Sequence, residues 1–191
     1  ETYQLTWDEH YGNQQPHSNN LLEYVNKRAL IQQGQQAVRQ PLKQRDGKGS
    51  MEELEQLGRV GGRLHECLKA IVEECGGTYL WAPPKSRERC VQKVQQEYGG
   101  DYSKLLDLER ATGLFEQAED MLHCLQRINE ECSSSSSSSQ AQAQAVSLRV
   151  LRCKDRLNKP LDSGYRDILM NVCEVQSGFV AELQLNFHKI A

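Results

Sequence analysis

Hydrophobic residues recur at helical spacing over two segments in the first part of the chain. We expect helices over residues 20–33 and 51–74, separated by a polar loop over residues 34–49. The apolar stripe of the second segment consists of Met51, Leu54, Leu57, Leu64, Leu68, Ile71 and Val72. Gly61 and Gly62 interrupt this stripe, and each weakens a helix by ~1 kcal/mol relative to alanine. We therefore expect a kink or a close packing contact at the glycine pair.

The second predicted helix has recognisable residues at both ends. Ser50 and Glu53 have the spacing of a capping box, in which the hydroxyl and the carboxylate each accept a backbone N–H group. Gly76 and Gly77 follow the last apolar position and end the helix as a C-cap.

Alternation and short apolar runs predict the remaining elements. The expected strands cover residues 78–82, 105–115, 147–153, 167–174 and 179–187, and the further helices cover 85–98 and 115–128. In the last strand the apolar set is Phe179, Ala181, Leu183, Leu185 and Phe187, and the other set is Val180, Glu182, Gln184 and Asn186. A period of two places these sets on opposite faces. The order of elements predicts an α+β (α/β sandwich) fold with a mixed five-stranded sheet flanked by helices.

Polar segments divide the chain. We expect a polar arm and helical extension over residues 1–49 and one domain over residues 50–191. A run of serines followed by Gln-Ala alternation forms a low-complexity insertion at 133–146, to which we assign no function.

Composition narrows the class of protein. The chain has 191 residues, which suits one domain, and its net charge of −3 argues against binding of duplex nucleic acid. No apolar run approaches the ~18 residues of a membrane span, and the first residues lack the apolar core of a signal peptide. The seven cysteines include no C-x-x-C pair. They favour reduced thiols in an intracellular protein, cytoplasmic or organellar, and argue against a zinc site.

Basic residues gather in the segment predicted to be a helix at 85–98. Lys85, Arg89 and Lys93 are spaced four residues apart, which places them near one face of a helix. They can act together on one anion, and a solvated basic face is the alternative interpretation.

Acidic residues interrupt the apolar strand predicted over 105–115. Asp107 and Glu109 lie two residues apart, so we expect their side chains to point the same way. A buried carboxylate needs a cation or a metal beside it, and Mg²⁺ takes one or two carboxylates together with phosphate oxygens. Asp107 and Glu182 are candidate Mg²⁺ ligands if their strands are neighbours. A carboxylate exposed to water on an edge strand is the alternative.

Four motifs follow one another along the chain: two lysines eight residues apart, Asp-Leu, Pro-x-x-x-Gly-Tyr and Glu-x-Gln. They are Lys85 with Lys93, Asp107 with Leu108, Pro160 to Tyr165, and Glu182 to Gln184. Their order resembles the synthetase domain of RelA/SpoT-type proteins, which transfer pyrophosphate from ATP to the 3′-hydroxyl of GDP or GTP to make (p)ppGpp. The resemblance covers residues 55–188.

The resemblance implies roles for the matching residues. The implied nucleotide-binding residues are Lys85, Arg87, Arg89, Lys93, Lys154, Arg156, Lys159, Tyr165 and Gln184. Tyr165 would stack on the guanine of the acceptor, an interaction worth ~1–3 kcal/mol. Asp107 and Glu182 would act as the catalytic residues and bind Mg²⁺, and Glu182 would also help to activate the 3′-hydroxyl.

The chain departs from the family pattern at several positions. Arg89 replaces a serine, Arg110 a glycine, Thr112 an arginine, Leu161 a lysine and Leu169 a histidine. Two hypotheses follow. The chain is either a divergent Mg²⁺-dependent pyrophosphate transferase that uses ATP, or a catalytically inactive domain of the same fold that binds a nucleotide, RNA or a protein partner.

Overall fold

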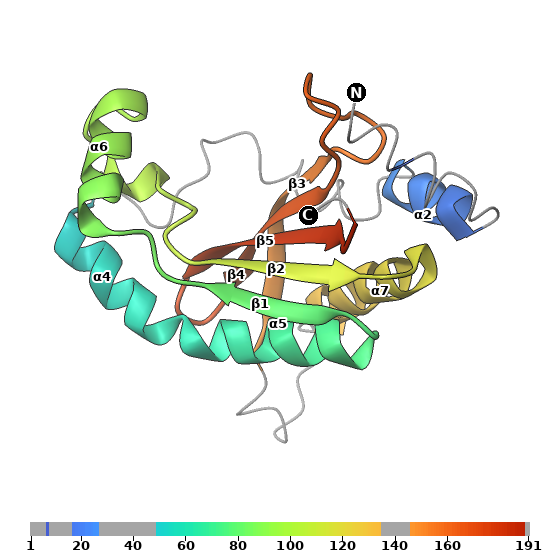
Figure 1. Ribbon diagram of the computed structural model, residues 1–191. Coiled ribbons are helices and arrows are strands. Elements are labelled where there is room, and N and C mark those ends of the chain that lie inside the picture. Colours follow the sequence, from blue (N-terminus) through green and yellow to red (C-terminus); the bar gives the residue numbers. More distant parts are fainter. Residues whose placement is uncertain (1–6, 8–16, 27–48, 135–145, 190–191) are drawn as a thin grey trace.

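Figure 1 shows a computed structural model of the chain, which describes residues 7, 17–26, 49–134 and 146–189. Most of the loop expected at 34–49 and of the insertion at 133–146 lies outside the described residues. The helix expected at 20–33 is described only as α2 (His17–Asn26).

Five strands form one mixed sheet in the order β1–β2–β5–β4–β3. β1 (Thr78–Ala82) runs antiparallel to β2 (Arg110–Phe115), and β2 runs parallel to β5 (Val180–Phe187). β4 (Ile168–Glu174) is antiparallel to β5 on one side and to β3 (Leu148–Asp155) on the other. The predicted α+β class with a mixed five-stranded sheet is therefore confirmed.

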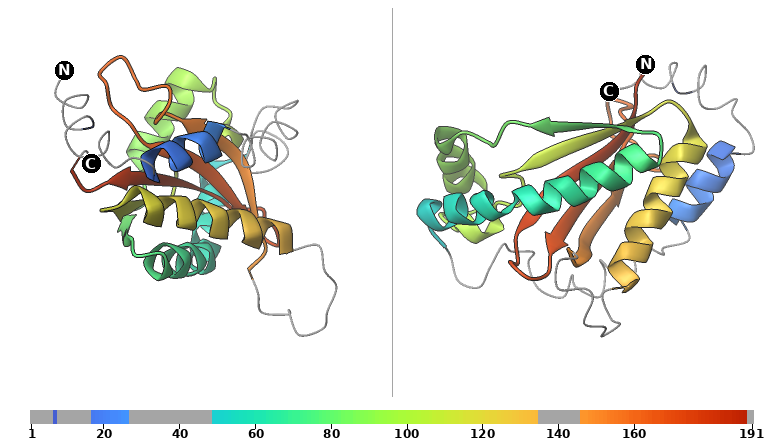
Figure 2. Two further views of the ribbon diagram at one scale, coloured as in Figure 1. Left: turned by 90° about the vertical axis from the view of Figure 1, so that its right-hand side faces the viewer. Right: turned by 90° about the horizontal axis from the view of Figure 1, so that it is seen from below.

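Helices cover one face of this sheet. Figure 2 shows α5 (Gly62–Glu74) and α7 (Ala118–Ser134) lying across it, with α2 beside α7. α4 (Met51–Val60) precedes α5, and α6 (Arg87–Glu97) lies at the end of the sheet near α4. The 3₁₀ helix η1 (Tyr102–Lys104) connects α6 to the segment before β2.

The main core lies between the sheet and its covering helices. The apolar set predicted for the last strand is wholly buried there, including Phe179, Leu183 and Phe187 at 0% exposure. Glu182 and Gln184 alternate with that set, so they point to the opposite side of the sheet, which we call the second face. The predicted alternation thus separates the core from the polar residues of the last strand.

The helix expected over 51–74 is divided in two at Gly61. The capping box is present, because Ser50 N donates to Glu53 Oε2 (2.9 Å) and Glu53 N donates to Ser50 Oγ (3.3 Å). A Cβ atom added at Gly61 would lie 2.5 Å from Cε1 of Phe179. The missing side chain of Gly61 therefore permits a close approach to the core, while its φ of −66° is one that any residue adopts. Gly76, with φ of +81°, ends α5 as expected.

Several predicted boundaries are wrong, and the helix expected at 115–128 covers Ala118–Ser134 instead. The strand expected at 105–115 begins only at Arg110, because Leu105 and Leu108 pack into a separate apolar cluster with α4 and α6. The helix expected at 85–98 begins at Arg87, because the hydroxyl of Ser86 accepts from Arg89 N and caps it. None of the helices in the described part of the chain has the length and apolarity needed to cross a bilayer.

Candidate active site

Asp107 lies between two lysines. Lys85 Nζ and Lys93 Nζ both donate to Asp107 Oδ2, the second over 2.8 Å. Lys85 precedes α6 and Lys93 belongs to it, while Lys85 N donates to Leu108 O (2.9 Å) and ties the two segments together. Burial alone would raise the pKa of Asp107, but hydrogen bonds from the two lysines and their charges outweigh it and hold the pKa below its usual value. The carboxylate is therefore ionised.

The second carboxylate oxygen of Asp107 is left without a hydrogen-bond partner. Oδ1 is buried and has no hydrogen-bond partner, although the side chain is 16% exposed as a whole. An ionised oxygen shielded from water is unfavourable unless a cation or a donor meets it.

Glu182 is the second acidic residue of the site. Its register partners are Arg110 on β2 and Asn171 on β4, and Gln184 Nε2 donates to Glu182 Oε1 (3.3 Å). Burial, followed by the charge of Asp107, raises the pKa of Glu182 above its usual value. The two carboxylates therefore lie within electrostatic reach of each other.

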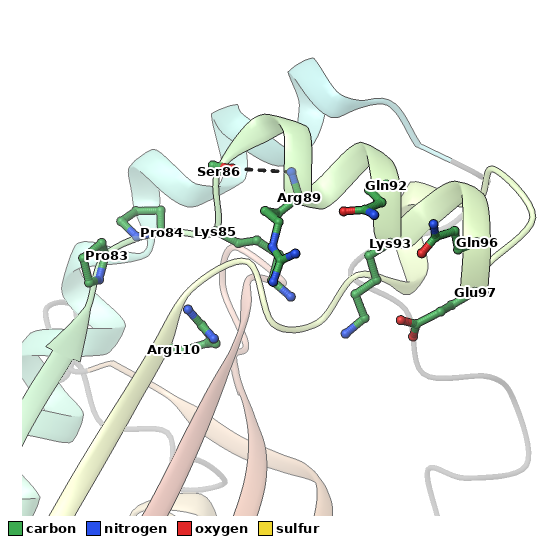
Figure 3. A pocket seen from close by; sticks show the side chains of 10 residues that line it. All are labelled: Pro83, Pro84, Lys85, Ser86, Arg89, Gln92, Lys93, Gln96, Glu97 and Arg110. Carbon is green, nitrogen blue, oxygen red and sulfur yellow. Dashed lines mark hydrogen bonds between the residues drawn. The ribbon is translucent and has the colours of Figure 1, made fainter.

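A pocket of about 520 Å³ adjoins Asp107 and its lysines (Figure 3). It is lined by Pro83, Pro84, Lys85, Ser86, Arg89, Gln92, Lys93, Gln96, Glu97 and Arg110. Figure 3 shows Arg89 and Lys93 projecting from α6 toward the side on which Arg110 begins β2. Four cations and one acid make this pocket suited to a polyanion.

Arg110 was noted in the sequence as a departure from the family pattern but was not assigned to the site. It follows the acidic segment directly and replaces the glycine of the family pattern. Only the parallel pairing of β2 with β5 places it beside Glu182.

Arg87 does not line this pocket. It donates to Glu52 (2.5 Å) and Glu55 (2.8 Å) of α4. These contacts attach α6 to α4, and the structure gives Arg87 no place among the cations of the pocket.

The segment between β3 and β4 holds Pro160, Gly164 and Tyr165, which the family resemblance assigns to the acceptor nucleotide, and we call it the acceptor loop. Asn186 Nδ2 donates to the hydroxyl of Tyr165 (2.8 Å), and Arg156 lies 5.9 Å from the centre of the Tyr165 ring. Arg156 also forms a two-bond ion pair with Asp167, at 2.5 and 2.6 Å. The tyrosine ring is thus oriented by β5 and by the first residue after β3. Lys159 lies on the surface of this loop.

Two rows of residues cross the second face from strand to strand. The first row is Arg110, Glu182, Asn171 and Arg152, and the second is Thr112, Gln184, Leu169 and Lys154. Burial, followed by the charges of Arg152 and Arg156, lowers the pKa of Lys154. Lys154 on β3 and Glu182 and Gln184 on β5, which were site candidates from the sequence, therefore share one surface with Arg110 of the pocket.

Glu109 points away from Asp107, contrary to the sequence expectation. Its Oε2 accepts from Trp81 Nε1 (3.0 Å) and lies 3.7 Å from Nε2 of His65, which stacks on the Trp81 ring. The two acids diverge because the segment before Arg110 is not a strand. Burial lowers the pKa of His65 to about 4, so the buried imidazole is neutral. Glu109 O also accepts from Glu182 N (3.0 Å), which joins this cluster to the site.

Two acidic residues of the site are of the kind that bind a magnesium ion. Asp107 and Glu182 supply two carboxylates, and Asp107 Oδ1 is a buried oxygen without a partner. Mg²⁺ is bound in proteins by one or two carboxylates with phosphate oxygens completing the shell. No group of three or more His, Cys, Asp or Glu side chains that could hold a metal occurs in the described ranges.

No protein-family model and no curated protein matches this chain. A GTP pyrophosphokinase family protein from Streptococcus pneumoniae matches with a TM-score of 0.52 and 16% identity over 72% of this chain and 68% of that chain. Small alarmone synthetase 2 from Bacillus subtilis matches with a TM-score of 0.51 and 18% identity over 73% of this chain and 72% of its own. At these identities the likeness shows the fold, so the chain has the fold of GTP pyrophosphokinases and small alarmone synthetases.

A further match is the type VI effector Tas1, solved in complex with its immunity protein. The TM-score is 0.48 and the identity 23% over 75% of this chain. This chain spans 63% of the effector's length, which is less than two thirds.

Proposed function

We propose that this chain is a divergent RelA/SpoT-like enzyme that transfers pyrophosphate from ATP to the 3′-hydroxyl of a guanosine nucleotide, with Mg²⁺. One observation supports it above the others: Asp107 is held by two lysines at a cationic pocket, within reach of Glu182, and offers an unpartnered oxygen. The shared fold supports the same reaction. Use of ATP also accords with an intracellular location.

The donor nucleotide would occupy the pocket beside α6. Lys85, Lys93, Arg89 and Arg110 line that pocket and would neutralise the triphosphate. Mg²⁺, held by Asp107 and Glu182, would add positive charge at the phosphates. Transfer of phosphoryl groups depends mainly on such positioning and charge neutralisation.

The acceptor would lie over the second face near the acceptor loop. The Tyr165 ring offers a stacking surface for the base, and its hydrogen bond from Asn186 fixes its orientation. Lys154, Arg156, Lys159 and Gln184 are the other proposed nucleotide-binding residues of this half. Arg87 would support the site only indirectly, because its ion pairs with Glu52 and Glu55 hold α6 against α4.

The proposed reaction is a displacement at the β-phosphorus of ATP. The 3′-oxygen of the acceptor forms a bond to that phosphorus, and the bond to the oxygen bridging the α- and β-phosphates breaks, so AMP leaves. Glu182 accepts the proton of the 3′-hydroxyl.

The test is AMP release from ATP and Mg²⁺ with GDP or GTP as acceptor. We expect AMP and a 3′-pyrophosphorylated product in equal amounts. Asp107→Asn and Glu182→Gln should each lower the rate by about 10²–10³-fold, the usual cost of losing one electrostatic contact to a transition state. Glu66→Gln, at an exposed carboxylate of α5, is the matched control and should keep the rate.

Two results would contradict this proposal. The transfer reaction would be excluded if wild-type protein formed AMP no faster than Asp107→Asn, both with GDP and with GTP as acceptor. Nucleotide binding without transfer would support the alternative of an inactive binding domain.

A further inference from the structure

Asn171 is the buried polar residue at the centre of the second face. It belongs to β4, is 0% exposed, and lies in register between Glu182 on β5 and Arg152 on β3. No motif of the sequence marked it.

The orientation of its amide is fixed by Arg152. Arg152 Nε donates to Asn171 Oδ1 over 2.7 Å. A guanidinium has only donors, so the carbonyl oxygen must face Arg152 and the NH₂ group must turn the other way. That group, Nδ2, is buried and has no hydrogen-bond partner.

A buried amide donor without a partner is costly, so this one points to a ligand. Directly opposed residues of antiparallel strands have Cβ atoms about 4.5–5.5 Å apart, so Asn171 and Glu182 present a donor and an acceptor side by side. An anionic ligand atom would be repelled by Glu182. A neutral oxygen that can accept a hydrogen bond, beside another hydroxyl that can donate one, satisfies both residues.

The 2′,3′-diol of a ribose has this arrangement. We propose that Asn171 Nδ2 donates to the 2′-hydroxyl oxygen of the acceptor while its 3′-hydroxyl meets Glu182, so that the site selects ribonucleotides over 2′-deoxyribonucleotides. This inference rests on the proposed function and adds the residue that recognises the acceptor's sugar.

The test compares GTP with 2′-deoxy-GTP. The donor pocket is first filled with α,β-methylene-ATP and Mg²⁺, since the methylene group replaces the oxygen of the bond that would break. Each acceptor is then titrated by calorimetry. Wild-type protein should bind 2′-deoxy-GTP about 10- to 100-fold more weakly, because a buried donor is left unpaired.

Two variants separate sugar recognition from general damage. Leucine has a shape similar to that of asparagine but no hydrogen-bond donor. Asn171→Leu should therefore bring the ratio of the two affinities close to one, chiefly by lowering the affinity for GTP. Asn186→Leu is the matched control on β5, because the Asn186 amide already donates to Tyr165 and its Oδ1 accepts from Phe187 N. Asn186→Leu should lower the affinity for both nucleotides and leave the ratio of the two affinities unchanged.

The outcomes distinguish the two proposals. If wild-type protein binds GTP and 2′-deoxy-GTP with equal affinity, this inference is overturned, and Asn171 meets only water. The proposed transfer reaction is not affected by that result. A ratio that survives in Asn171→Leu also overturns it. Binding of neither nucleotide contradicts the proposed function, and this inference with it.

Discussion

At the scale of single residues, the candidate site contains buried polar groups that folding leaves unsatisfied. Glu182 has a raised pKa because burial and Asp107 disfavour its ionised form. Asp107 Oδ1 and Asn171 Nδ2 are buried without partners. Residues in such environments gather at functional sites, because ligand binding supplies what folding leaves unpaired.

We predict that Glu182→Gln stabilises the protein. A carboxyl whose pKa is raised on folding holds its proton to a higher pH in the folded state than in the unfolded state. Wild-type stability therefore falls as pH rises from the unfolded value through the raised value. The variant does not titrate there, so its advantage should grow across this window and stay constant above it.

Thermal unfolding measured from pH 4 to pH 8 checks this prediction, with Glu66→Gln as the exposed control. A wild-type protein more stable than Glu182→Gln at pH 7 would show that contacts of the charged form outweigh its burial.

At the scale of elements, the junction of α4 and α5 depends on one of two adjacent glycines. A Cβ at Gly61 would lie 2.5 Å from Phe179 Cε1, whereas a Cβ at Gly62 would meet nothing within 4 Å. Phe179 is 0% exposed in the main core, so it has little room to move.

We predict opposite effects of alanine at these two positions. Gly61→Ala should lower the free energy of unfolding by about 1–3 kcal/mol, since overpacking displaces the ring. Gly62→Ala should raise it by roughly 0.5–1 kcal/mol, since alanine restricts the unfolded chain and suits the first turn of α5. Urea denaturation of both variants provides the comparison, and equal shifts in one direction would contradict it.

At the scale of the whole molecule, the sheet joins the two halves of the site. The parallel pairing of β2 and β5 brings the segment after Asp107 to Glu182, and β4 and β3 extend the same surface toward Tyr165. The sheet thus connects the cationic pocket, through Arg110, to the loop that holds Tyr165.

We predict that α,β-methylene-ATP with Mg²⁺ raises the melting temperature of the whole domain. A ligand that binds only the folded state adds about 2.7 kcal/mol of stability at a concentration 100 times its dissociation constant. The shift should disappear in a Lys85→Ala/Lys93→Ala double variant. Arg59→Ala, which removes an exposed cation lying outside this pocket, should retain it. An equal shift in the double variant would place the nucleotide elsewhere.

The sequence by itself determined the elements, because their signals are local. The capping box at Ser50, the glycine kink at Gly61 and the alternation of the last strand each depend on residues a few positions apart. The start of the strand at Arg110 was predicted too early. Leu105 and Leu108 pack on α4 and α6, but their local sequence pattern looks the same as that of strand residues.

Only the tertiary structure decided which side chains meet. Lys85 and Asp107 are 22 residues apart in sequence, and Arg152 and Asn171 are 19 apart. The first contact depends on the packing of the start of α6 against the segment before β2, and the second depends on strand order, register and the bulge in β3, none of which local periodicity specifies. The same non-local packing turned Glu109 toward His65 and left the amide of Asn171 directed along the row that holds Glu182.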